Sequence, residues 1–154
     1  MARKDMVEYN GGGPSEAVNL DFKVGAGGQN KPEDVMTAQA LLRYLGLDNE
    51  RRKQFLGNIV PPKSDGICGP KTLRAIRSFQ QKHAHRLIMV DGVIHPASYK
   101  GRQINETSKP ILTITLLHLF AVQCMFWLPD ADYISGLIRI EPKLRGVLVG
   151  KIDI

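Results

Sequence analysis

The sequence predicts a mainly α-helical protein with a small β pairing, and three observations support this fold class. Apolar residues recur at helical spacing in residues 33–45 and 70–83, a nearly continuous apolar run covers 111–127, and β-type alternation is confined to the two ends of the chain. A chain of 154 residues with 43% hydrophobic and 23% charged residues is typical of one globular domain with an elaboration. This composition excludes collagen-like, fully disordered and disulfide-framework chains.

The N-terminal region is expected to be a flexible tail followed by one strand. Residues 1–16 are rich in glycine just before Pro14, which disfavours both helix and strand. Residues 17–24 then alternate between apolar and other side chains, which is the period of a strand. The apolar positions of this expected strand are Val18, Leu20, Phe22 and Val24.

Two helices are marked by their ends as well as by their spacing. The first begins near Pro32, carries acids in its first turn where they favour the helix dipole, and stops at Gly46. The second begins at Pro70 or Lys71 and runs to about His83. The expected buried positions are Val35, Ala38, Leu41, Leu42 and Leu45 in the first helix, and Leu73, Ile76, Phe79 or Gln80, and His83 in the second.

A third, shorter helix is expected after Pro96, with Tyr99 and Ile104 as its apolar anchors. The apolar run at 111–127 predicts a buried central helix, or less strongly an oligomer interface. It is shorter than the ~20 residues of a membrane span and contains His118, so no membrane span is expected.

The C-terminal third offers weaker patterns. The β-branched opening of the apolar run leaves a strand at 111–115 as an alternative to helix. A short helix is expected over 131–139, and a strand over 146–154 that pairs with the strand at 17–24 and ties the chain ends together.

The strongest motif is an internal repeat. Residues 65–72 read Asp-Gly-Ile-Cys-Gly-Pro-Lys-Thr, and residues 91–98 read Asp-Gly-Val-Ile-His-Pro-Ala-Ser. Asp-Gly makes a tight turn in which glycine supplies a positive φ, the next apolar residue is expected in the core, and proline opens a helix. We call these segments the first joint and the second joint. The expected structural residues are Asp65, Gly66, Gly69, Pro70 and Thr72 in the first, and Asp91 and Gly92 in the second.

Together these segments resemble the peptidoglycan-binding domain found on many bacterial cell-wall hydrolases, over about residues 33–105. Besides the joints, the resemblance rests on Val35, Gln39, Leu42, Gly46, Ala75, Phe79 and Gln80. It implies a three-helix bundle that binds peptidoglycan or a muropeptide, through the stem peptide or the glycan, without catalysis. The second joint departs from the family pattern at His95 and Ser98, where the family usually has Gly and Thr. The glycine-rich lead at 24–35 resembles members associated with type VI secretion.

The predicted organisation is a flexible tail at 1–16, a peptidoglycan-binding-like domain with an N-terminal strand at 17–105, and a C-terminal extension at 106–154 packed on it. The formal charge of +6 is unevenly placed along these parts. Residues 51–105 hold eleven basic and two acidic residues, whereas 106–154 hold five of each. A region this basic favours an anionic polymer or surface as partner, with a solvated helix face as the alternative.

The expected ligand-binding residues lie on the second helix. Lys71, Arg74 and Arg77 on its outer face would hold a peptide carboxylate or another anion, and solvated surface is the alternative for each cation alone. Gln80 would either reach a glycan or muropeptide amide or satisfy loop backbone.

No catalytic residue, metal ion or cofactor is expected. His83 and His85 are two apart, which does not bring them onto one helical face, and no HExxH motif is present. The acids of the middle region are used in turns, and Cys68 and Cys124 are interpreted as buried thiols.

Two further classes of function remain open at this stage. The first is a protein-interaction adaptor of a secretion assembly, with the apolar run 111–127 and the extension as its interface. The second is DNA binding, because Arg74, Arg77, Lys82 and Arg86 imitate a recognition helix; that geometry does not require the joints, so nucleic acid is the less favoured partner. The charged start of the chain lacks the apolar segment of a secretory signal, which predicts a cytoplasmic protein or one delivered to the periplasm by a dedicated secretion system.

Overall fold

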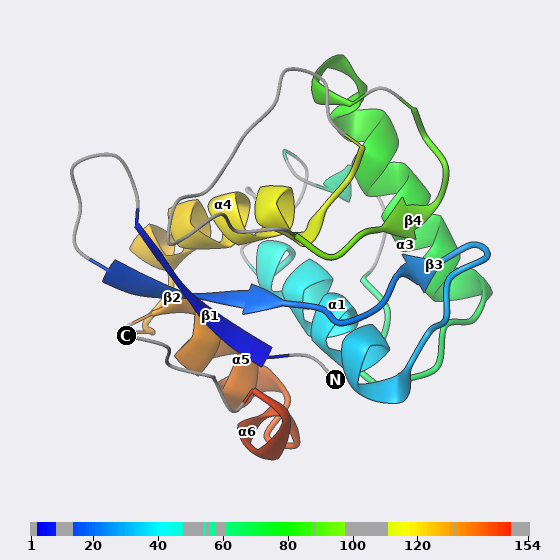
Figure 1. The fold of residues 1–154 in the computed structure, drawn as a ribbon. Helices are drawn as coiled ribbons and strands as arrows, with labels where there is room; N and C mark the ends of the chain where they lie inside the picture. The colour runs from blue at the N-terminus through cyan, green and yellow to red at the C-terminus, as the bar shows by residue number, and fades with distance from the viewer. Residues whose placement is uncertain are drawn as a thin grey trace.

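The computed structural model describes residues 3–8, 14–47, 54, 56–57, 61–87, 89–97, 111–130 and 132–148. Its helices are α1 (Pro32–Leu45), α3 (Pro70–Lys82), α4 (Ile114–Cys124), α5 (Tyr133–Ile140) and α6 (Leu144–Val147), with single 3-10 turns at Ala84–Arg86 and Met125–Trp127. Its strands form two antiparallel pairs, β1 (Arg3–Glu8) with β2 (Pro14–Asn19) and β3 (Val24–Gly25) with β4 (Val93–Ile94). The mainly helical fold class with a small antiparallel sheet is confirmed (Figure 1).

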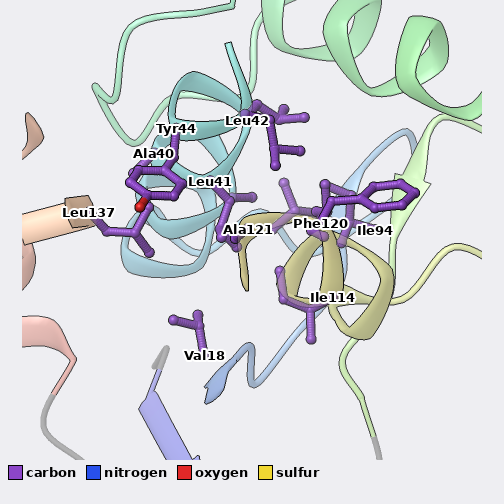
Figure 2. Close-up of a cluster of buried hydrophobic side chains, with 14 of the residues drawn as sticks. Val18, Ala40, Leu41, Leu42, Tyr44, Ile94, Ile114, Phe120, Ala121 and Leu137 are labelled. Atoms are coloured by element: carbon purple, nitrogen blue, oxygen red, sulfur yellow. The ribbon is translucent and has the colours of Figure 1, made fainter. Parts of the chain in front are cut away.

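Helix α1 lies at the centre of the molecule, with α3 on one side and α5 and α6 on the other (Figure 1). It begins at Pro32 as predicted, and the N–H of Gly46 closes its last turn on the carbonyl of Arg43 at 3.0 Å. The five predicted core positions of this helix are all buried. Figure 2 shows Leu41 and Leu42 of α1 in one buried cluster with Ile114, Phe120 and Ala121 of α4, so α1 and α4 share one core.

The extension is part of that core. Helix α4 packs against α1 and β2, and α5 packs against α1, α4 and β2. The side chains of Leu117 and Ala121 in α4 and of Leu137 in α5 are fully buried. Burying one leucine is worth about 2 kcal/mol, so removal of the extension would expose a large part of the apolar surface of α1.

The segment that leads into α4 contains both the extended backbone and the helix that were the alternatives predicted for it. Thr113 forms a parallel β-bridge with His95, in which the N–H of His95 donates to the carbonyl of Leu112 and the N–H of Ile114 donates to the carbonyl of His95, both at 2.9 Å. The β-branched opening is therefore extended at Thr113, and the helix begins only at Ile114.

The N-terminal region differs from its prediction. Strand β1 lies within the expected flexible tail and pairs with β2 in the register Arg3↔Asn19 to Glu8↔Pro14. The expected strand at 17–24 is split between β2 and β3, because the N–H groups of Asp21 and Phe22 both donate to the carboxylate of Asp34 at 3.2 Å. These two hydrogen bonds turn the chain away from the sheet, and Phe22, an apolar position of the expected strand, is 38% exposed.

The C-terminal prediction is wrong over residues 146–147. The expected strand is the helix α6, in which Leu144 and Val147 lie three residues apart on one face and are both buried. That spacing fits a helical turn packed on α1 and α5. In the described part of the chain β2 pairs with β1, and residues 149–154 lie outside that part, as does the third helix expected around Tyr99 and Ile104.

A buried polar pair links α4, α5 and β2. The hydroxyl of Tyr133 accepts a hydrogen bond from the N–H of Val18 at 2.7 Å and is hydrogen-bonded to Nδ1 of His118. Burial lowers the pKa of His118 to about 4, so this ring is neutral at physiological pH. Among the described residues, no helix has the length and apolar character that a membrane crossing needs.

We expect Gly136→Ala to destabilise the protein strongly. A Cβ at Gly136 would lie 2.3 Å from Cε1 of the buried Tyr44 ring and 2.8 Å from Oδ2 of Asp130, so α5 would have to move away from α1. Overpacking of this kind costs about 1–3 kcal/mol. The free energy of unfolding from urea titration measures it.

Gly146→Ala is the matched control, because a Cβ there meets no atom within 4 Å in the exposed part of α6. Alanine in a helix is more favourable than glycine by about 1 kcal/mol, so this variant should be as stable as the parent or more so. Equal stability of the two variants would contradict the close packing of α5 on α1.

The stability of the protein should fall between pH 6.5 and pH 4 because of His118. Its pKa is about 4 in the folded protein, against about 6.5 in the unfolded chain, so the unfolded chain binds the extra proton in this window. The stabilisation is complete above pH 6.5 and is lost as the pH falls to about 4, by about 3 kcal/mol. Urea titrations at pH 7, 6 and 5 measure this slope.

His118→Asn keeps a hydrogen-bonding group near the Tyr133 hydroxyl and does not titrate, so its stability should depend less on pH in the same window. The exposed His85 provides the control, because His85→Asn should keep the full slope of the parent. An unchanged slope in His118→Asn would assign the pH dependence to another group.

Candidate functional site

The first joint is built on one buried side chain of α1, Gln39. Its Oε1 accepts the N–H of Gly66 at 2.9 Å. Its Nε2 lies 3.0 Å from Oδ1 of Asp65, 3.0 Å from the carbonyl of Ile67 and 2.9 Å from Oγ1 of Thr72. A single amide thus holds the turn and the first turn of α3 against α1.

The second joint repeats the arrangement on Gln80 of α3. Its Oε1 accepts the N–H of Gly92 at 2.8 Å, and its Nε2 donates to Oδ1 of Asp91 at 2.7 Å and approaches the carbonyl of Val93 at 3.3 Å. In both joints the aspartate Oδ1 also accepts the N–H two residues further on, at 3.0 Å. The sequence repeat is therefore a structural repeat of a glutamine amide bound to an Asp-Gly turn.

The glycines of the joints are required by backbone conformation and by close approach. Gly66 has φ +77° and Gly92 has φ +73°, in the left-handed region that favours glycine. A Cβ at Gly66 would lie 3.0 Å from the carbonyl oxygen of Pro32. A Cβ at Gly92 would lie 2.9 Å from Nε of Arg77, which places this guanidinium directly over the second joint.

Hydrogen bonds to both aspartates hold their pKa values below the ordinary range. For Asp65 the main cause is the N–H of Ile67, followed by the Gln39 amide. Burial raises the pKa of Asp91, but the hydrogen bonds from the Gln80 amide and the N–H of Val93, together with the nearby His95 ring, outweigh this effect. The Nε2 atom of His95 lies 3.6 Å from Oδ2 of Asp91, so this departure from the family pattern is next to the joint carboxylate.

The apolar residue of each turn behaves differently in the two joints. Val93 is 7% exposed and packs in the core as predicted, whereas Ile67 is 69% exposed, so the prediction for Ile67 is wrong. Strand pairing of β4 with β3 turns Val93 inward, and the first joint has no such pairing. Pro70 opens α3 as predicted, after Gly69 as the N-cap residue.

The outer face of α3 carries an open groove of about 450 Å³, which we call the α3 groove. It is lined by Pro70, Leu73, Arg74, Arg77, Ser78 and Gln81. Arg74 and Arg77 are exposed there as predicted, and Lys71 is exposed on the same helix outside the groove lining. Leu73 was expected in the core but is half-buried and forms part of the groove floor.

Gln80 is not accessible to a ligand. Its side chain is fully buried and its amide is held by the second joint, so the structure favours the interpretation in which it satisfies loop backbone. The sequence pattern did not indicate this role for Gln39, because Gln39 lies 26 residues before the aspartate it binds, whereas Gln80 lies only 11 residues before its own. The sequence feature that could have indicated this role is the glutamine that each helix carries within its apolar face.

The described residues contain no group of three or more His, Cys, Asp or Glu side chains that could hold a metal ion. His83 is buried with its ring centroid 4.7 Å from that of Phe79 and 4.7 Å from that of Phe120, as expected for a core residue. Cys124 is buried as predicted, while Cys68 is half-buried. Burial raises the pKa of the Cys68 thiol, which makes it a poor nucleophile at neutral pH.

Comparison with known families agrees with this geometry. Residues 31–97 match the model of the family described as "Putative peptidoglycan binding domain", a span that starts just before α1 and ends within the second joint. No curated protein and no solved structure matches the chain. The matched region thus contains the first joint, all but the last residue of the second joint, and the α3 groove, and α4, α5 and α6 lie beyond it.

We expect Gln39→Met to destabilise the protein by about 3 kcal/mol, because methionine has a similar shape but leaves the buried N–H of Gly66 and the polar groups facing Nε2 without their partner. Gln123→Met on the exposed side of α4 is the matched control and should lie within about 0.5 kcal/mol of the parent. Urea titration of both variants at pH 7 measures the difference, and a Gln39→Met protein as stable as the control would refute the amide-centred joint.

Proposed function

We propose that this protein is a non-catalytic module that binds bacterial peptidoglycan through the α3 groove. The observation that carries the proposal is the match of residues 31–97 to the peptidoglycan-binding family model, in a region where the structure builds both joints and leaves a groove beside them. Helical scaffolds with rigid turns place surface side chains in fixed positions, which is what a shallow binding face needs.

The groove has the chemistry for a muropeptide. Arg74 and Arg77 lie four and seven residues after Pro70 and offer guanidinium groups that bind carboxylates in bidentate geometry. Leu73 gives an apolar surface for methyl groups and sugar faces, and Ser78 and Gln81 offer neutral hydrogen-bonding groups. No acidic residue lines the groove, so a carboxylate of the stem peptide is not repelled there.

The second joint supports this face from below. Because the guanidinium of Arg77 lies over Gly92, the turn that Gln80 fixes also supports the Arg77 side chain that lines the groove. A change that loosens this turn would therefore alter ligand binding as well as stability.

For the cellular system and compartment in which the protein acts, the proposal keeps the prediction made from the sequence. The protein would act in a cell-wall-related or type VI secretion system, either in the cytoplasm or after delivery to the periplasm by that system. The adaptor function is the second candidate, and one observation favours it. Phe126 and Trp127, in the 3-10 turn that follows α4, are 77% and 51% exposed. Adjacent exposed aromatic side chains are typical of protein interfaces.

Co-sedimentation with purified sacculi tests the proposal. The parent protein should be retained, and Arg74→Ala/Arg77→Ala should weaken retention at least tenfold, because the two cations that face the ligand carboxylates are lost. Lys82→Ala is the matched control on the same helix, since Lys82 is exposed but does not line the groove. Circular dichroism checks that both variants are folded.

Loss of retention in Lys82→Ala equal to that in the double variant would indicate charge attraction without a site. No retention of the parent above a protein of equal charge would overturn the wall-binding proposal. Light scattering then addresses the adaptor: a strictly monomeric parent that co-purifies with no secretion component would count against it.

A further inference from the structure

A second groove lies between the first joint and the corner where α5 meets α6. It has a volume of about 430 Å³ and is separate from the α3 groove, with no lining residue in common. We call it the corner groove. One wall comes from α1 and the segment before the first joint, and the other wall comes from the extension.

The corner groove carries charges of both signs. Three of its lining residues are cations, Arg43, Lys63 and Lys143, and two are acids, Asp65 and Glu141. A groove that binds a polyanion would not contain acidic side chains, because they repel the ligand. A groove that binds a neutral glycan would not need any of these five charged side chains. Interspersed charges of both signs match a ligand that itself has a carboxylate and an amine close together.

Several of these groups are held in place. Nη1 of Arg43 donates to Oγ of the buried Ser64 at 3.2 Å, which leaves further guanidinium N–H groups for a ligand. The hydrogen bonds that fix Asp65 in the first joint use its Oδ1. Its pKa lies below the ordinary range, so the group is ionised at neutral pH.

The extension wall is equally fixed. Glu141 caps the end of α5, where its N–H donates to the carbonyl of Leu137 at 2.9 Å, and Leu137 is fully buried against the core. The N–H of Lys143 lies 3.4 Å from Oε1 of Glu141. The backbone at Glu141 can therefore shift only together with α5. The close packing of Gly136 in α5 against Tyr44 in α1 opposes a shift of α5.

We propose that the corner groove binds a zwitterionic peptide segment, with its carboxylate on Arg43, Lys63 and Lys143 and its amine on Glu141 and Asp65. Resting on the proposed function, we assign this segment to the stem peptide of peptidoglycan, whose diamino acid carries a free amine near a carboxylate. The volume lies in the range of about 300–1,000 Å³ that small-ligand sites occupy. Because Glu141 and Lys143 lie outside residues 31–97, the extension supplies one wall of a site that the family-matched region alone lacks.

Isothermal titration with synthetic stem tetrapeptides tests the assignment. The free tetrapeptide should bind the parent, and two modified peptides, one amidated at the terminal carboxylate and one acetylated on the diamino acid, should each bind at least tenfold more weakly. Lys63→Ala and Lys143→Ala, one from each wall, should each weaken binding of the free peptide several-fold. Arg145→Ala is the control, since Arg145 is an exposed cation on α6 that does not line the groove.

The outcomes separate this inference from the wall-binding proposal. Retention on sacculi with no binding of the free tetrapeptide, or with binding that Lys63→Ala and Lys143→Ala leave unchanged, would overturn the corner groove and leave the α3 groove standing. Tetrapeptide binding that these two variants weaken, without retention on sacculi, would support a zwitterionic-peptide site and overturn wall binding. Equal affinity for free lysine and for the tetrapeptide would overturn the assignment to a stem peptide.

Discussion

The structure depends on two buried glutamine amides. A buried amide is costly unless its oxygen and both of its hydrogens find partners, and an Asp-Gly turn offers one N–H, one carboxylate and one carbonyl at the right spacing. Gln39 and Gln80 each bind such a turn, so α1 fixes the entry to α3 and α3 fixes the entry to β4. Helix α1 thereby orients α3, and α3 orients β4. Both grooves border a joint, the α3 groove through Arg77 over Gly92 and the corner groove through Asp65.

The second constraint is the shared core of the matched region and the extension. Helix α1 is buried on more than one side because α4, α5 and α6 pack on it, and the apolar side chains of α4 point into the same cluster (Figure 2). This explains the uneven charge of the chain. An extension that packs on the core needs apolar side chains and a balanced surface, while four cations of the basic region, Lys71, Arg74, Arg77 and Lys82, lie exposed on α3.

Local sequence patterns were sufficient to predict the helix ends and the glycine positions of the joints. Pro32 and Gly46 bound α1, Pro70 opens α3, and the glycine positions of both joints follow from the positive φ that their turns require. Local patterns could not predict which residues far apart in the sequence contact each other. Gln39 lies 26 residues from Asp65. Ile67 and Val93 occupy the same motif position but differ in burial. Residues 3–8, expected in a flexible tail, form a strand because β2 lies beside them. The residues of the corner groove come from three segments far apart in the sequence, so no spacing pattern connects them.

The two grooves differ in charge in a way that bears on a branched ligand. The α3 groove presents two cations with apolar and neutral polar neighbours, which suits a carboxylate attached to a sugar or methyl-bearing unit. The corner groove presents cations and acids together, which discriminates against ligands that carry only one kind of charge, because the opposite set would then stay unpaired. A stem peptide attached to a glycan offers both kinds of group on one covalent framework. Two weak, shallow sites on a rigid scaffold would then bind one strand with the avidity of a linked pair, since the second contact becomes intramolecular. If both grooves bind one strand, the extension does not enlarge the α3 groove. It adds the corner groove, which selects for a second chemical feature of the same ligand.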